Sequence, residues 1–244
     1  MAHEYDGDRR TFLKSAAMAS GGLLLTGFAG PSLAGPSSQA SQAAKKEGNA
    51  DEVSPAEDLM REHGVLNRVL LIYDEAMRRI EAGAELSPEP LAKAADLIRR
   101  FVEDYHEKLE EEHLFPRFRK ANRLVELVDV LVKQHEAGRH LTDQIKQAAN
   151  AAALKKPEER RKLADSLRAF NRMYRPHEAR EDTILFPAFR TIVPPGEYDA
   201  LGEEFENKEH ALFGADGFEK AVDEVATIEK SLGIYELGQF TPQA

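Results

Sequence analysis

The feature that most constrains this chain is a segment of fourteen residues that occurs twice. HEKLEEEHLFPRFR begins at His106 and HEAREDTILFPAFR begins at His177, so the copies lie 71 residues apart and share eight of fourteen positions. Upstream of each copy a histidine recurs in a similar triplet, REH ending at His63 and KQH ending at His135, which lie 72 residues apart. The near-equal shifts predict a fold made of two copies of one structural unit.

Each unit is predicted to be a helical hairpin. In the first unit, Ser54–Glu57 combines an N-cap serine, a proline at the first helical position and a glutamate three residues after the cap. Gly83 is expected to end this helix. A second helix is expected over residues 87–120, with a kink at Pro116, because an internal proline distorts a helix.

The second unit repeats this order. Helices are expected over residues 124–153 and 157–189, and the run IVPPGE ends the last of them. No stretch of the sequence shows the sustained alternation of apolar and polar residues that is typical of a strand. We therefore predict an all-α, antiparallel up-down four-helix bundle over residues 54–192, with additional C-terminal helices over residues 193–244 that pack on it.

Composition limits the function. Hydrophobic residues make up 42% of the chain, which is enough for a sizeable core. The formal net charge of −10 and the pI near 5.4 argue against nucleic acid and anionic membranes as partners, because both require a basic face. The chain has no cysteine, which excludes a thiolate nucleophile and cysteine-ligated metal sites. Any bound metal must therefore be held by histidine and carboxylate.

The N-terminus resembles an export signal. Arg9–Arg10 precede a weakly apolar run, Ala16–Phe28, as in twin-arginine signal peptides, and small residues up to Ala34 predict cleavage there. The run is too short to span a bilayer, so we expect no stable membrane insertion after cleavage. Residues 1–34 are thus predicted to be a signal peptide read by the twin-arginine export machinery, which places the protein in the periplasm or otherwise outside the cytoplasm. Residues 35–53 are predicted to be a flexible linker.

The repeated segments also carry a chemical pattern. Residues four apart lie on one face of a helix, so His106 faces the same way as Glu110, and His177 the same way as Glu181. Two hairpins related by a pseudo-two-fold axis bring these residues to one level of the interior, together with the upstream histidines. The candidate site contains six residues: His63, His106, Glu110, His135, His177 and Glu181.

Such a set in a core needs either a network of His–Glu hydrogen bonds or a cation, because buried carboxylates are almost always paired or metal-bound. Helix bundles hold dimetal sites in this way, with carboxylates that bridge the ions. A mixed imidazole and carboxylate set favours iron, with manganese or zinc less favoured. Its nitrogen-rich composition favours binding of a small oxidant.

These six residues, with LFP after each His-x-x-x-Glu, resemble the hemerythrin-like, His-His-Glu cation-binding family over about residues 54–192. The resemblance implies a four-helix bundle with a non-haem diiron site that binds dioxygen or related small oxidants. Other members of that family take part in nitric oxide, peroxide and iron handling. Two iron ions are therefore the expected cofactor.

The resemblance also implies how the ligands are shared. His63 and His106 would ligate one iron, His135 and His177 would ligate the other, and the two repeated glutamates would bridge them. This sequence departs from oxygen-carrying hemerythrins, in which the third helix contributes two histidines four apart and the fourth-helix carboxylate follows its histidine by five residues. Here the residue four after His135 is Arg139, which is no ligand.

His210 is the candidate for a further ligand or a residue that closes the site. It lies on a predicted fifth helix, which Phe205, Leu212 and Phe213 are expected to anchor against the bundle. The alternative for His210 is an exposed position on an amphipathic helix. His113 shares the face of His106, and packing is its expected role.

Four neighbours of the predicted ligands have simpler expected roles. Glu107 and Glu178 are expected on solvated faces. Tyr105 and Tyr174 are expected to pack in the core, with hydrogen bonding near the site as the alternative.

Three functions remain open from the sequence. The first is an exported diiron protein that binds dioxygen or a related small oxidant as a reservoir, scavenger or sensor. The second is a diiron oxidoreductase that acts on peroxide or nitric oxide, with a separate reductase as a possible partner. The third is iron storage or donation.

Overall fold

The computed structural model describes residues 54–242, and this part of the chain is helical, with no strand. The predicted all-α fold with additional C-terminal helices is confirmed. The predicted signal peptide, residues 1–34, and the predicted linker, residues 35–53, lie outside the described residues.

The first hairpin contains α2, Pro55–Glu81, and a second rod that continues without a loop from residue 88 to residue 120. The second rod is divided into α3 (Pro88–Leu97), η1 (Ile98–His106), α4 (Glu107–Leu109), η2 (Glu110–Leu114) and α5 (Phe115–Lys120). Ser54 caps α2 as predicted, because its hydroxyl accepts the backbone N–H of Glu57 at 3.3 Å. Gly83, with a φ of +66°, follows the end of α2 in the left-handed region that glycine enters at low cost.

The second hairpin repeats this plan with one difference from the prediction. Its elements are α6 (Val125–Ala148), α7 (Ala151–Leu154), α8 (Pro157–Arg180), η3 (Glu181–Leu185) and α9 (Phe186–Ile192). The single helix predicted for residues 124–153 is wrong at its end, because α6 stops at Ala148. The Asn150 side chain accepts the backbone N–H groups of Ala152 and Ala153 and so starts the short helix α7.

A π-helical turn begins at the same place in each hairpin, and the first hairpin has a further π-helical segment, η1. The turn η2 begins at Glu110 and the turn η3 begins at Glu181. Pro116 and Pro187 follow these turns, and a proline has no N–H for the carbonyl four residues earlier and clashes with that carbonyl in a regular α-helix. The wider π turn relieves this conflict, so the distortion predicted at Pro116 takes this form and recurs in the second copy.

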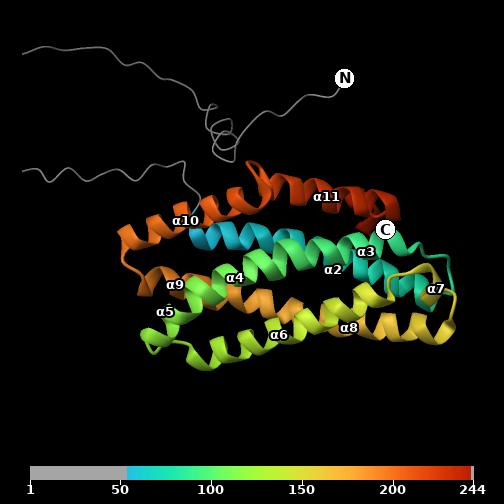
Figure 1. The fold of residues 1–244 in the computed structure, drawn as a ribbon, viewed down its shortest axis with the longest axis horizontal. Helices are drawn as coiled ribbons and strands as arrows, with labels where there is room; N and C mark the ends of the chain where they lie inside the picture. The colour runs from blue at the N-terminus through green and yellow to red at the C-terminus, as the bar shows by residue number, and fades with distance from the viewer. Residues whose placement is uncertain (1–53, 243–244) are drawn as a thin grey trace, which may run out of the picture. The chain divides into compact units, whose positions relative to one another are not determined.

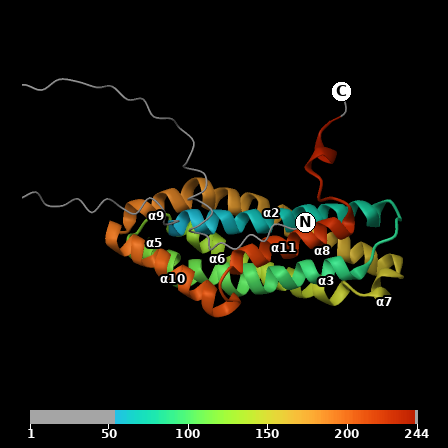
Figure 2. The same ribbon diagram turned by 90° about the horizontal axis from the view of Figure 1, so that it is seen from above.

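The four rods run along the long axis of the bundle (Figure 1). After them, α10 (Pro195–Phe213) and α11 (Gly217–Leu232) fold back along one side, and a short 3-10 turn, Leu237–Phe240, follows. Both helices contact α2, and α11 also contacts α3. Figure 2 shows the same arrangement from above. The extension therefore covers the first hairpin.

The bundle interior is closed at the end that holds the LFP segments. Phe118 and Phe189, which correspond in the two copies, lie 6.1 Å apart between ring centroids, and Tyr198 of α10 packs on Phe189. Toward the other end, Tyr73 and Phe170 meet edge to face. Within residues 54–242, no helix combines the length and apolar character needed to cross a membrane.

Candidate metal centre

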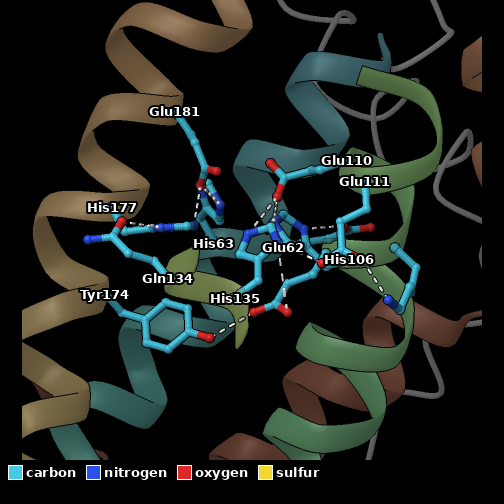
Figure 3. Close-up of polar contacts among 12 residues, drawn as sticks. Glu62, His63, His106, Glu110, Glu111, Gln134, His135, Tyr174, His177 and Glu181 are labelled. Carbon is cyan, nitrogen blue, oxygen red and sulfur yellow. Dashed lines mark hydrogen bonds and ion pairs between the residues drawn. The ribbon is translucent and has the colours of Figure 1, made fainter. Parts of the chain in front are cut away.

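The six residues singled out in the sequence lie together in the bundle core (Figure 3). They come from all four rods, and each is at most 3% exposed. The contributors are α2 (His63), η1 (His106), η2 (Glu110), α6 (His135), α8 (His177) and η3 (Glu181). The two His-x-x-x-Glu segments place their carboxylates facing each other, as the helical spacing requires.

Glu181 lies between two imidazoles from different hairpins. Its Oε2 is 3.1 Å from Nε2 of His177, one turn earlier on the same rod, and 3.4 Å from Nε2 of His63 on α2. One carboxylate thus reaches both hairpins.

Glu110 occupies the matching place on the other side. Its Oε2 is 3.4 Å from Nε2 of His135 and 3.9 Å from Nε2 of His106. Within each hairpin the two imidazole rings lie close together. The ring centroids of His63 and His106 are 4.7 Å apart, and those of His135 and His177 are 5.0 Å apart. The core thus holds two imidazole pairs, and each of the two carboxylates contacts one imidazole of both pairs. A bridged dimetal site needs this arrangement.

The donor atoms at the centre suit a cation. Both carboxylate oxygens of Glu110, both of Glu181 and Nε2 of His135 are buried and make no hydrogen bond, although the ion-pair distances above are short. Buried polar atoms are nearly always satisfied, because an unsatisfied one costs free energy. One ligand atom from each of Glu110, His135, His177 and Glu181 can be chosen so that all lie within 4.8 Å of one another, and the same holds for His63, His106 and Glu110.

The electrostatics of the site also indicate that it suits a cation. Burial raises the pKa of Glu110 well above its ordinary value, and the charge of Glu181 raises it further. Burial also acts to raise the pKa of Glu181, but contacts with His177 and His63 lower it instead. Burial and the neighbouring charge of His63 lower the pKa of His106 well below its ordinary value. The pKa values of two equivalent glutamates thus shift in opposite directions, and divalent cations would stabilise both as carboxylates.

The pKa of His63 shifts in the opposite direction from that of His106. Burial alone would lower its pKa, but the hydrogen bond to Asp182 and the contact with Glu181 raise the pKa of His63 to about 10. Metal binding requires the neutral ring, so a bound cation would have to displace this proton.

A second layer of residues orients the four imidazoles. In each ring the outer nitrogen, Nδ1, faces an acceptor oxygen, so Nδ1 carries the proton of the neutral ring and Nε2 faces the centre. The four contacts are His63 to Asp182 Oδ1 at 2.7 Å, His106 to Glu62 Oε2 at 2.8 Å, His135 to Glu111 Oε1 at 3.1 Å and His177 to Gln134 Oε1 at 2.9 Å.

These acceptors were missed in the sequence, although the repeat contains them. Glu62 and Gln134 directly precede the first histidine of each hairpin, and Glu111 and Asp182 directly follow its glutamate. Neighbours on a helix point in different directions, so adjacency to a ligand does not suggest contact with another ligand. The contacts arise between rods, which is why only the assembled bundle shows them.

The phenylalanines of the LFP segments are buried and shape the site. The ring of Phe115 stacks on His135 at 5.5 Å, and that of Phe186 stacks on His63 at 5.5 Å. Each phenylalanine therefore holds an imidazole from a neighbouring rod and shields it from water.

The expectation that Glu107 and Glu178 are solvated is wrong. They are only 1% and 5% exposed. Glu107 accepts hydrogen bonds from the Tyr174 hydroxyl at 2.7 Å and from Arg139 at 2.8 Å, and Glu178 accepts one from Asn67 at 3.0 Å. A partner from another helix makes their burial tolerable, and a single-helix pattern does not reveal such a partner.

Arg139 fills the position where oxygen-carrying hemerythrins have a further histidine. Besides Glu107, its guanidinium contacts Glu111 at 2.5 Å. The site therefore keeps four histidines from the four rods, as the sequence indicates.

The structure does not bring His210 to the cluster. Its side chain is exposed, and the residue beside it, Glu209, is buried instead. The inner face of α10 continues from Phe205 to Glu209, and a step of one residue turns the side chain by about 100°. Leu212, predicted to anchor this helix, is 54% exposed, whereas Phe213 packs on the bundle.

His113 takes the packing role that was expected. Its ring meets Phe205 edge to face at 5.3 Å. It thus helps to join α10 to the first hairpin and takes no part in the cluster.

A surface pocket lies over one side of the site. Its volume is about 210 Å³. Its lining consists of Glu111, Phe115, Arg119, Val132, Glu136 and Arg139. Two of these residues contact His135 directly, so the His135 side of the cluster lies beneath this pocket.

A four-helix bundle with imidazole pairs and two facing carboxylates in its core defines a class of metal-binding helical proteins. The family model described as "Hemerythrin HHE cation binding domain" matches residues 54–188. The chain belongs to this hemerythrin family.

Two mycobacterial relatives carry no functional description. The chain is 50% identical over 190 residues to the uncharacterized protein Rv1995 of Mycobacterium tuberculosis, and this region covers 78% of this chain and 74% of the relative. The uncharacterized protein Mb2018 of Mycobacterium bovis gives the same figures. No solved structure matches the chain significantly.

Proposed function

We propose that the six clustered residues hold two iron ions and that this protein binds dioxygen or a related small oxidant there. The observation that carries the proposal is that Glu110 and Glu181 each reach one histidine of both imidazole pairs. His63 and His106 would hold one ion, and His135 and His177 the other. A ferrous pair supplies the electrons that binding of an oxidant requires.

The residues around the cluster support this function by position. Four acceptors fix the imidazoles with Nε2 inward, and Phe115 and Phe186 exclude water from two of the rings. Arg139 contacts both Glu107 and Glu111 and keeps these side chains in place beside the site. Such a preorganised, shielded set holds metal ions without rearrangement.

A second candidate function is a diiron oxidoreductase for peroxide or nitric oxide. It is favoured by one observation, Arg139 in place of a fifth histidine, because fewer protein ligands leave more positions open for chemistry. A separate reductase would then supply electrons. Iron storage or donation is the weaker alternative, since the shielded donor set favours retention of metal.

We also propose that the protein is exported by the twin-arginine machinery. The support is the Arg9–Arg10 pattern and the small residues before position 35. This route carries folded proteins, so metal would be inserted before export.

The test is the iron content and the visible absorption of the full chain, reduced without oxygen, exposed to oxygen and then depleted of it. Two irons per chain and an oxygen-dependent band that disappears on depletion are the expected result. A ferric spectrum that persists would favour redox turnover. Failure to bind two ions would overturn the diiron assignment.

A further inference from the structure

The two imidazole pairs are alike in geometry but differ in what surrounds them. We call the pair His63 and His106 the first position, and the pair His135 and His177 the second position. The distances to the two glutamates are similar at both. The two positions differ in the groups that accept hydrogen bonds from the Nδ1 atoms of their imidazoles.

At the first position both acceptors are carboxylates. Asp182 accepts from His63 at 2.7 Å, and Glu62 accepts from His106 at 2.8 Å. Both imidazoles of this pair therefore face a carboxylate at Nδ1.

At the second position the acceptors carry less negative charge. His177 faces the neutral amide oxygen of Gln134 at 2.9 Å. His135 faces Glu111, but that carboxylate is held between Arg139 and Lys108, each at 2.5 Å. Arg139 and Lys108 therefore offset Glu111, and Arg139 also pairs with Glu107, whose Oε2 lies 4.0 Å from Nδ1 of His135.

This contrast affects metal binding in two ways. A carboxylate that accepts the hydrogen bond from Nδ1–H makes Nε2 of the same imidazole a stronger metal ligand. An amide oxygen that accepts this hydrogen bond has a smaller effect. The surrounding charge adds a through-space effect, because carboxylates favour a nearby cation and an arginine opposes it, more strongly inside a protein than in water. Both effects favour a cation at the first position.

We propose that the two metal positions are inequivalent, and that the first position, His63 and His106, binds a divalent ion more tightly and fills before the second. Glu62 and Gln134, which occupy corresponding places in the two hairpins, set most of the difference. This inference rests on the proposed dimetal function.

The experiment is a calorimetric titration of the metal-free full chain with Fe²⁺ under anaerobic conditions, repeated with Co²⁺. Repulsion between two ions separates the steps in any dimetal site, so the assignment depends on variants. Glu62→Gln and Gln134→Glu exchange the two acceptors with almost no change of shape.

Wild type is expected to bind two ions in two steps. Glu62→Gln should weaken the tighter step by roughly 10- to 100-fold, the usual effect of losing such an acceptor. Gln134→Glu should tighten the weaker step by a similar factor and bring the two steps together. Far-UV circular dichroism of each variant checks the fold.

The outcomes separate the two proposals. Fewer than two ions per wild-type chain would overturn the dimetal function itself. Two ions bound with both steps shifted equally by every variant would overturn only the inequivalence. A weaker second step in Glu62→Gln, with the tighter step unchanged, would reverse the assigned order.

Discussion

The two hairpins of the bundle agree in their ligands and differ in their charges. Each supplies two histidines and one glutamate at shifts of 71 or 72 residues, and each has its π turn at that glutamate. By contrast, the first hairpin has Glu62 and Asn67 where the second has Gln134 and Arg139. The repeated positions thus build the geometry of the site, and the positions that differ set its local charge.

The comparison is tested most strongly by removing the shared carboxylates. We expect Glu110→Ala and Glu181→Ala to lower bound iron alike, from two ions to less than one per chain, because each glutamate reaches both imidazole pairs. Elemental analysis measures the iron, and circular dichroism is expected to show a helical protein. His210→Ala, on an exposed side chain, is the control and should keep its iron. Two irons retained in either glutamate variant would contradict the site assignment.

The next test concerns position 139, where the second hairpin has an arginine and the first has Asn67. Arg139→Met leaves Glu107, which is buried, without its cation, and we expect the metal-free protein to lose about 3 kcal/mol of unfolding free energy. Asn67→Ala removes the corresponding hydrogen bond to Glu178 and should cost only about 1 kcal/mol, because no charge pair is broken. Urea unfolding of the metal-free proteins measures both. Equal losses would mean that the two hairpins do not differ in this way.

The smallest test compares two helical glycines. A Cβ at Gly138 would lie 2.8 Å from Cζ of Tyr174 and even closer to its hydroxyl, so Gly138→Ala should destabilise the protein by about 1–3 kcal/mol. A Cβ at Gly64 meets nothing within 4 Å. Gly64→Ala should therefore stabilise the protein by about 0.5–1 kcal/mol, since alanine favours a helix.

Thermal unfolding of the two metal-free variants should thus show shifts of opposite sign. A neutral Gly138→Ala would mean that Tyr174 does not hold its hydroxyl against α6 and that its hydrogen bond to Glu107 is dispensable. Tyr174→Phe is the companion variant, because it removes that bond without adding a methyl group.

Local signals predicted the main helices well and failed where a side chain depends on another rod. Ser54 and Gly83 mark the ends of α2, as their capping chemistry requires. The break at Asn150 was missed, because the alanine-rich sequence around it favours a continuous helix and the cap competes with that preference.

In the site, too, some features could be predicted from one helix and others depend on a neighbouring helix. The spacing of four residues on repeated helices was enough to single out the six clustered residues. It was not enough to place Glu107 in the interior or His210 outside it, because both depend on how a neighbouring helix is rotated. One residue of rotation, about 100°, exchanges Glu209 for His210 at the contact with the bundle.

The sequence by itself determined the helical class, the doubled hairpin and the six candidate ligands, since periodicity and spacing act within one helix. Only the tertiary structure decided which groups face the outer nitrogens of the imidazoles. Those contacts form between residues 24 to 119 positions apart in the chain, so their direction depends on packing between the rods. The geometry of the site therefore follows from the repeat, and its charge asymmetry follows from the assembled bundle.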